Sequence, residues 1–165
     1  MHWLSRRLKE KLNVVFIENY CVTLAEYLMP ASEISEQISL AGREASGTGN
    51  MKAVLNGALM LCTTDGANIE IMEKCGIDNS FPFGLTESDK DIIDHNGYNA
   101  MDYYNSDDRI RTVITYLDNG FNGESFHDIS QYLLGETPHR DIYMCLADFG
   151  DYIRADALMD QTYRN

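Results

Sequence analysis

A chain of 165 residues is long enough to bury a hydrophobic core and is a typical length for one domain. Its 26 acidic and 13 basic residues give a formal net charge of −13. That excess argues against nucleic acid and against an anionic membrane surface as partners, because both require clustered lysine and arginine. With 44% hydrophobic and 24% charged residues, the composition is that of a folded globular protein.

Positive charge is concentrated at the start of the chain, where residues 1–13 have a net charge of +3 and the other 152 residues have −16. The apolar run 14–17 ends at Glu18 and is too short for a signal peptide. No run approaches the roughly 18 apolar residues of a membrane span. The sequence therefore predicts a soluble, cytoplasmic protein that makes no membrane contact.

The spacing of cysteine and histidine does not predict a metal site. Cysteines stand at positions 21, 62, 75 and 145, without a Cys-x-x-Cys pair and without the histidine spacing of a zinc site. Cys62 lies in an apolar run, so we expect it to be a buried free thiol. Free thiols fit a reducing compartment better than a disulfide framework does.

Continuous apolar runs predict three strands, at 14–17, 59–64 and 81–84. We expect the first two to be buried parallel strands, because they are apolar throughout. Pro82 favours an edge position or a strand start for the third.

Helical spacing of apolar residues predicts helices between the strands and after them, at 2–12, 23–29, 50–57, 68–74, 86–97, 107–119, 125–134 and 139–163. Thr23 can cap the second helix, and Pro30 is expected to end it. The last segment is one helix or a broken pair, and 31–38 is a short amphipathic stretch. Strands alternating with helices predict an α/β fold with a parallel sheet, although three strands are few for a complete domain of that class.

The segment SGTGN, residues 46–50, is rich in turn-forming residues and opens a helix. Glycines there let backbone N–H groups converge where the helix dipole is positive, which suits an anion such as phosphate. The spacing matches neither a Walker A motif nor the GxGxxG fingerprint. On spacing alone, the segment is an ordinary helix start or an anion cradle.

Lys52 lies in the first turn of that helix, where a cation is electrostatically unfavourable. The apolar pattern places it beside Met51 and Val54, so we expect it to be half-buried. Burial close to positive potential favours the neutral, nucleophilic form of an amine. An anion cradle beside such an amine suits pyridoxal phosphate, with its phosphate in the cradle and its aldehyde on Lys52.

These segments closely resemble the pyridoxal-phosphate signature of the glycogen, maltodextrin and starch phosphorylases. The signature segments are EASGTGNMK at 44–52, LNGAL at 55–59 and TDGANIE at 64–70. Supporting segments follow the family's order, with VVFIENY at 14–20, EQIS at 36–39 and looser matches at 97–100 and 147–153. The match is dense over about residues 12–100.

The resemblance implies that residues 1–165 are part of a Rossmann-like, glycosyltransferase-B type domain, namely the C-terminal domain that binds pyridoxal 5′-phosphate. Family members use inorganic phosphate to remove the terminal glucose of an α-1,4-glucan such as glycogen or maltodextrin. They release α-glucose 1-phosphate with retention of configuration, and the cofactor's phosphate exchanges a proton with the substrate phosphate.

Individual residues match functional positions of the family. Lys52 matches the lysine that binds the cofactor as a Schiff base, and Thr48 and Gly49 match residues that hold the cofactor's phosphate. Tyr20 matches a tyrosine close to the cofactor, while Cys21 stands where some members carry arginine. The matches to the glucose-binding positions are Glu44, Ser46 and Gly47.

The resemblance also implies that the chain lacks the family's N-terminal domain and the basic residues that hold the substrate phosphate. We therefore expect no complete catalytic set, no activity of the chain alone, and self-association through an exposed sheet edge and apolar surface. Its expected partners are the glucan, inorganic phosphate and the N-terminal domain. Two alternatives remain: a non-catalytic, partner-binding or regulatory remnant of the fold, and a stand-alone pyridoxal-phosphate-binding protein.

Overall fold

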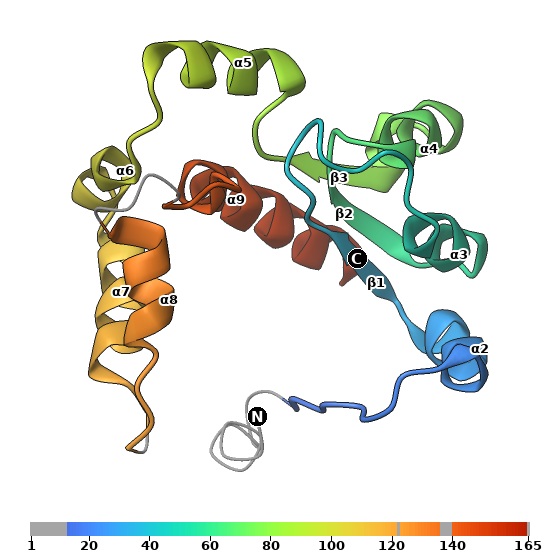
Figure 1. The fold of residues 1–165 in the computed structure, drawn as a ribbon. Coiled ribbons are helices and arrows are strands. Elements are labelled where there is room, and N and C mark those ends of the chain that lie inside the picture. The colour runs from blue at the N-terminus through green and yellow to red at the C-terminus, as the bar shows by residue number, and fades with distance from the viewer. Residues whose placement is uncertain (1–12, 122, 136–139, 165) are drawn as a thin grey trace.

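The computed structural model describes residues 13–121, 123–135 and 140–164, and Figure 1 shows their arrangement. Three parallel strands lie in the order β1-β2-β3; their bounds are β1 (Ile34–Gln37), β2 (Leu59–Thr63) and β3 (Ser80–Phe83). The expected α/β fold with a short parallel sheet is confirmed. The strand that contains Pro82 lies at an edge of this sheet, as predicted.

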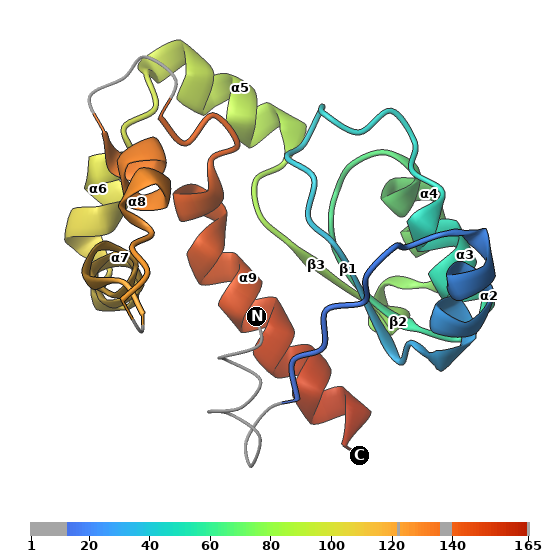
Figure 2. The same cartoon turned by 60° about the horizontal axis from the view of Figure 1, so that its bottom comes forward.

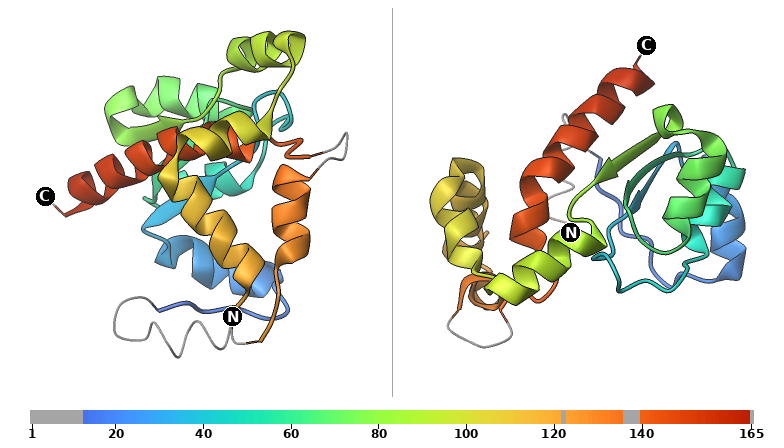
Figure 3. Two further views of the ribbon diagram at one scale, coloured as in Figure 1. Left: turned by 90° about the vertical axis from the view of Figure 1, so that its left-hand side faces the viewer. Right: turned by 90° about the horizontal axis from the view of Figure 1, so that it is seen from above.

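Helices pack on both faces of the sheet. On one face lie α3 (Gly49–Leu55) and α4 (Ala67–Cys75), with α2 (Val22–Ala31) beside α3. The long helix α9 (Cys145–Tyr163) crosses the other face, as the right-hand view of Figure 3 shows. A short 3-10 helix, Ile77–Asn79, leads into β3.

The first hydrophobic core lies between the sheet and α9. Leu61 of β2 is completely buried and is paired in register with Phe81 of β3. The ring of Tyr152 on α9 packs edge-on against Phe83, with the ring centroids 5.1 Å apart. Residues Ala155 and Met159 complete this core. Alternate residues of the strands thus supply the apolar surface that α9 covers.

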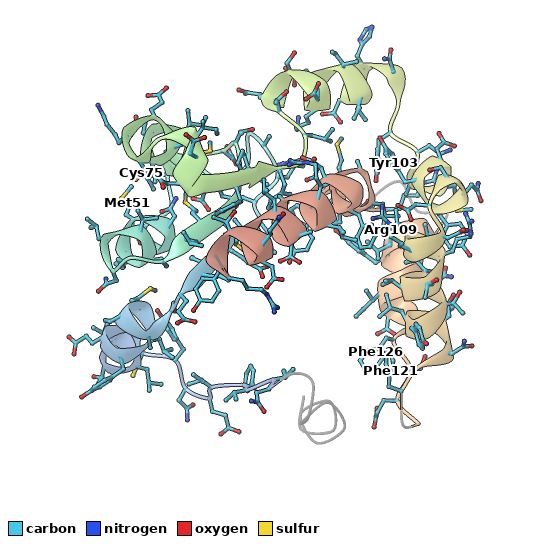
Figure 4. All side chains as sticks on the ribbon, turned by 180° about the vertical axis from the view of Figure 1, so that it is seen from behind. Met51, Cys75, Tyr103, Arg109, Phe121 and Phe126 are labelled. Atoms are coloured by element: carbon cyan, nitrogen blue, oxygen red, sulfur yellow. The ribbon has the colours of Figure 1, made fainter. Side chains whose placement is uncertain are left out.

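A group of helices beyond the sheet surrounds a second core. After β3 the chain forms α5 (Glu87–Asn96), which begins with a reciprocal capping pair between Thr86 and Asp89. The helical lobe that follows contains α6 (Ala100–Ser106), α7 (Asp108–Asn119) and α8 (His127–Leu134). Figure 4 shows Tyr103 and Arg109 on this lobe, and Met51 and Cys75 on the opposite part of the molecule. The lobe packs on the start of α9 through Ala100, Ile110, Ile114 and Leu146.

A buried carboxylate anchors the first turn of α9. Asp141 is completely buried and accepts hydrogen bonds from the N–H groups of Cys145, at 2.8 Å, and Leu146, at 3.0 Å. The Tyr98 hydroxyl donates to the same carboxylate at 2.5 Å. Burial and this acidic neighbour raise the pKa of Tyr98, so the phenol stays protonated as the donor. Asp141 therefore ties the segment between α5 and α6 to α9.

The strand predicted at 14–17 is wrong. Val15 and Phe16 are 75% and 67% exposed, and residues 13–17 form no strand. Instead Ile34–Gln37, which the sequence marked only as amphipathic, forms β1 and pairs with β2. Strand formation depends on a hydrogen-bonded neighbour more than on intrinsic propensity. Among the described residues, only the second segment has such a neighbour.

Several helix boundaries differ from the prediction. Helix α2 begins at Val22 with Cys21 at its N-cap position, so the cap expected at Thr23 is wrong. Pro30 lies inside the last turn of α2 rather than ending it, and the Ser32 hydroxyl donates to the carbonyl of Leu28 at 2.7 Å. Helix α6 was not predicted, because its sequence lacks a clear apolar period; the side chain of Asn99 caps it. Helix α9 begins at Cys145 rather than near residue 139. The helix predicted at 2–12 lies outside the described residues.

Replacing Asp148 with asparagine is expected to stabilise the chain at neutral pH. The half-buried Asp148 on α9 accepts a 2.8 Å hydrogen bond from the N–H of Leu85, and burial raises its pKa from 3.8 to about 6. Because the folded-state pKa lies above the unfolded one, stability is lost as the pH rises from about 4 to 6. Asp148→Asn keeps an acceptor for Leu85 but cannot ionise.

Urea unfolding at several pH values measures this effect. At pH 7.5 we expect the free energy of unfolding of Asp148→Asn to exceed that of the wild type by up to about 3 kcal/mol. The difference should disappear near pH 4. The exposed Asp91→Asn variant is the matched control for the change of charge. A stability difference independent of pH would contradict the assignment to Asp148.

Candidate functional site

The candidate site lies at the carboxyl ends of β1 and β2, where loops of a parallel sheet meet. The long loop 38–48 leads from β1 to α3, and the short turn 64–66 leads from β2 to α4. The N–H of Ala67 donates to the carbonyl of Ser46 at 2.8 Å, so the two connections lie side by side. Figure 2 shows both arching over the same edge of the sheet.

Asp65 organises the long loop from the turn. Its side chain is 7% exposed and accepts hydrogen bonds from the N–H groups of Gly42 at 3.0 Å, Arg43 at 3.2 Å and Glu44 at 2.8 Å. The N–H of Gly66 donates to the same carboxylate at 2.9 Å. The sequence pattern assigned Asp65 no role of its own beyond its place in the segment at 64–70. An aspartate directly after a buried strand, facing a glycine-containing loop, was the available signal.

Two buried asparagines fix the start of α3 against the start of α4. The Nδ2 of Asn50 donates to the Oδ1 of Asn68 at 2.7 Å, and the Nδ2 of Asn68 donates to the carbonyl of Thr63 at 3.0 Å. The Oδ1 of Asn50 accepts from the N–H of Met51 at 2.8 Å. These contacts fix the position of α3, the helix that carries Lys52, relative to β2. The sequence assigned no role to either asparagine.

Lys52 is exposed, which corrects the expectation that it is half-buried. Helix α3 has only two turns, and its buried side chains are Asn50 and Ala53. Lys52 therefore lies beside the buried face rather than in it. Its Nζ donates to the hydroxyl of Thr48 at 3.4 Å, so the amine and the helix start are in contact.

The structure brings Tyr20 and Lys52 together. Both line a groove of about 620 Å³ between α2 and α3. Met29 and Pro30 form part of its apolar wall, and Glu26 adds a carboxylate. Tyr20 itself is 61% exposed. An amine, an aromatic ring and an apolar wall therefore share one concave surface.

The predicted sugar-binding residues lie together on the long loop, directly before α3. Glu44 is exposed, and its Oε1 accepts from the N–H of Ser46 at 3.4 Å. Gly47 has φ +80°, a conformation that favours glycine, and a side chain there would contact Asn50. The loop and the groove are thus joined through the first turn of α3.

Metal and membrane features are absent from the described part of the chain. No group of three or more metal-binding side chains occurs there, and its helices include none that is long and apolar enough to cross a membrane. All four cysteines are free thiols, and burial raises the pKa of Cys62 to about 11. That thiol is therefore inert at neutral pH.

Comparison with known proteins gives one consistent family. The chain is 45% identical to human muscle glycogen phosphorylase over 156 residues, covering 94% of this chain and 18% of the relative. It is 48% identical to glycogen phosphorylase of Haemophilus influenzae over 161 residues, covering 97% of this chain and 20% of the relative. The chain thus spans about a fifth of the length of these curated relatives. The family model described as carbohydrate phosphorylase matches residues 5–165, and the chain belongs to that family.

Proposed function

We propose that this chain is part of the C-terminal, cofactor-binding domain of a cytoplasmic α-1,4-glucan phosphorylase. The observation that carries the proposal is the shared groove of Tyr20 and Lys52 in a chain of the carbohydrate phosphorylase family. The reaction of the whole protein would be phosphorolysis of glycogen or maltodextrin to α-glucose 1-phosphate. The relatives named above carry the name glycogen phosphorylase, which supports this substrate class.

The residues of the groove fit pyridoxal 5′-phosphate. Its volume of about 620 Å³ lies within the usual range of roughly 300–1,000 Å³ for cofactor and small-molecule sites. The exposed amine of Lys52 is accessible to attack an aldehyde without rearrangement of the fold. The ring of Tyr20 and the apolar wall suit a flat, aromatic pyridine.

Each residue then has a distinct role toward the cofactor. Lys52 Nζ would hold it covalently, and the Thr48 hydroxyl and the Gly49 N–H would donate to its phosphate. When bound, the cofactor supplies a phosphate that can give a proton to, or accept one from, the substrate phosphate. Backbone donors at a helix start are already oriented and need no reorganisation to stabilise an anion.

The loop before α3 would bind the glucose unit. The exposed carboxylate of Glu44 would accept hydrogen bonds from sugar hydroxyls, and bonds to a charged acceptor are the stronger ones. Ser46 and Gly47 would contribute a hydroxyl and backbone groups. Sugar and cofactor would then be held on consecutive segments of the same chain, which fixes their relative position.

Lys52 is expected to be the preferred site of cofactor attachment. After incubation with pyridoxal phosphate and borohydride reduction, peptide mass spectrometry should find about tenfold more adduct on Lys52 than on the exposed Lys74. Lys52→Arg should abolish that adduct, and Lys74→Arg is the control that leaves it unchanged. Pyridoxal without phosphate should label Lys52 less, because it lacks the group bound by Thr48.

Equal labelling of all accessible lysines would contradict the proposal. A folded chain with no adduct would instead favour the non-catalytic, partner-binding alternative.

The 165-residue chain alone is expected to release no glucose 1-phosphate from glycogen. Two phosphates at the site would together bring about three to four negative charges. In the described loops 38–48 and 64–66 and in α3, the cations are Arg43 and Lys52. A coupled assay with the Haemophilus influenzae relative as positive control measures this. Phosphate-dependent release by the isolated chain would overturn the expectation.

A further inference from the structure

We propose that Asp65 is the positioning residue of the sugar-binding loop, acting through the backbone of residues 42–44 to set the direction of Glu44. The inference rests on the proposed function, since Glu44 matters only if the loop binds a sugar. It adds a residue that touches neither sugar nor cofactor, yet decides whether the binding groups are in place.

Both oxygens of Asp65 are fully engaged. Oδ1 accepts from the N–H groups of Gly42 and Gly66, and Oδ2 accepts from those of Arg43 and Glu44. Asparagine could not replace this arrangement in either orientation of its amide. Its NH₂ group would always face two N–H donors, so at least two hydrogen bonds would be lost.

Asp65 interacts with backbone N–H groups of the loop and not with a cation. Its side chain is 7% exposed, and no described lysine or arginine forms an ion pair with it. A buried carboxylate needs hydrogen bonds to offset its loss of hydration. Four converging backbone donors provide them, and three of the four belong to the loop. The turn therefore holds the loop through these backbone donors.

A second contact holds the loop on the other side of Glu44. The Ser46 carbonyl accepts from the N–H of Ala67, and Gly66 passes close beneath it. A Cβ at Gly66 would lie 2.7 Å from the Ser46 carbonyl oxygen, and φ there is +52°, so the approach depends on glycine. Glu44 is thus held from both sides, with its carboxylate left exposed.

The expected effect is a loop that loses order while the rest of the fold remains. Hydrogen exchange in Asp65→Asn should be at least about tenfold faster across residues 42–48, because the loss of even one of these charge-assisted hydrogen bonds corresponds to that factor. Exchange in β2 should change much less. Asp107→Asn is the matched control, because Asp107 also accepts from a backbone N–H, that of Arg109, but does so at the start of α7.

Added glucose supplies the readout that a purely structural role would not affect. Glucose should slow exchange of residues 44–47 in the wild type and in Asp107→Asn, but not in Asp65→Asn. Equal protection by glucose in all three chains, or unchanged exchange of the loop in Asp65→Asn, would overturn the proposal. If loop exchange is faster in Asp65→Asn but glucose has no effect in any of the three chains, Asp65 does order the loop. In that case the loop does not bind sugar, and the proposed function fails.

A measurement on the wild type covers the case in which Asp65→Asn does not fold. The amides of Gly42 and Glu44 should exchange at least about tenfold more slowly than that of Ala45, whose N–H donates to no described residue. The amide of Arg43 is left out, because it also donates to the carbonyl of Leu40 at 3.0 Å. Equal exchange rates of Gly42, Glu44 and Ala45 would show that the carboxylate does not hold the loop in solution.

Discussion

The two hydrophobic cores share one helix, and the anchoring of its first turn determines where it lies. Asp141 holds the N–H groups at the start of α9 and the hydroxyl of Tyr98 in a buried, charge-assisted network. From that anchor the helix contributes Leu146 to the helical lobe and Ala155 to the sheet core. Figure 2 shows α9 running between the two parts. Loss of the anchor would leave buried donors unpaired and would disturb both cores together.

The carboxyl edge of the sheet is organised by the same chemistry. A buried aspartate after β2 holds the preceding connection through backbone donors, and an amide pair fixes the neighbouring helix. Such contacts place side chains without using those side chains in packing, so Glu44 and Lys52 remain exposed. A candidate site built from exposed groups on firmly held backbone requires no more than a short helix and a loop.

The sequence predicted most of the fold, and its failures have identifiable causes. The run 59–64 was recognised as a buried strand because it is apolar throughout, and Thr86 with Asp89 marked a helix start. Residues 14–17 satisfy the same apolar criterion but have no neighbouring strand among the described residues, and apolar pattern alone cannot supply one. Ile34–Gln37 was missed because half of its residues are polar, yet β2 offers it a hydrogen-bonding edge.

The candidate residues could be chosen from the sequence, but the contacts that support them could not. The position of Lys52 at a helix start and the family resemblance singled it out, and the structure places Tyr20 on the same groove although 32 positions separate them. The burial expected for Lys52 was wrong, because a two-turn helix can hide only one narrow face. The roles of Asp65 and Asn68 depend on contacts across about 20 residues of sequence, which no local pattern contains.

The uncovered run at 14–17 has a consequence for the fate of the polypeptide in a cell. Val15 and Phe16 are presented to solvent next to other apolar groups, on a chain segment that forms no regular structure. Chaperones and proteases recognise extended apolar segments of this kind as a mark of incomplete folding. A partner that covered this run would bury Val15 and Phe16 and remove the apolar surface that such quality control recognises.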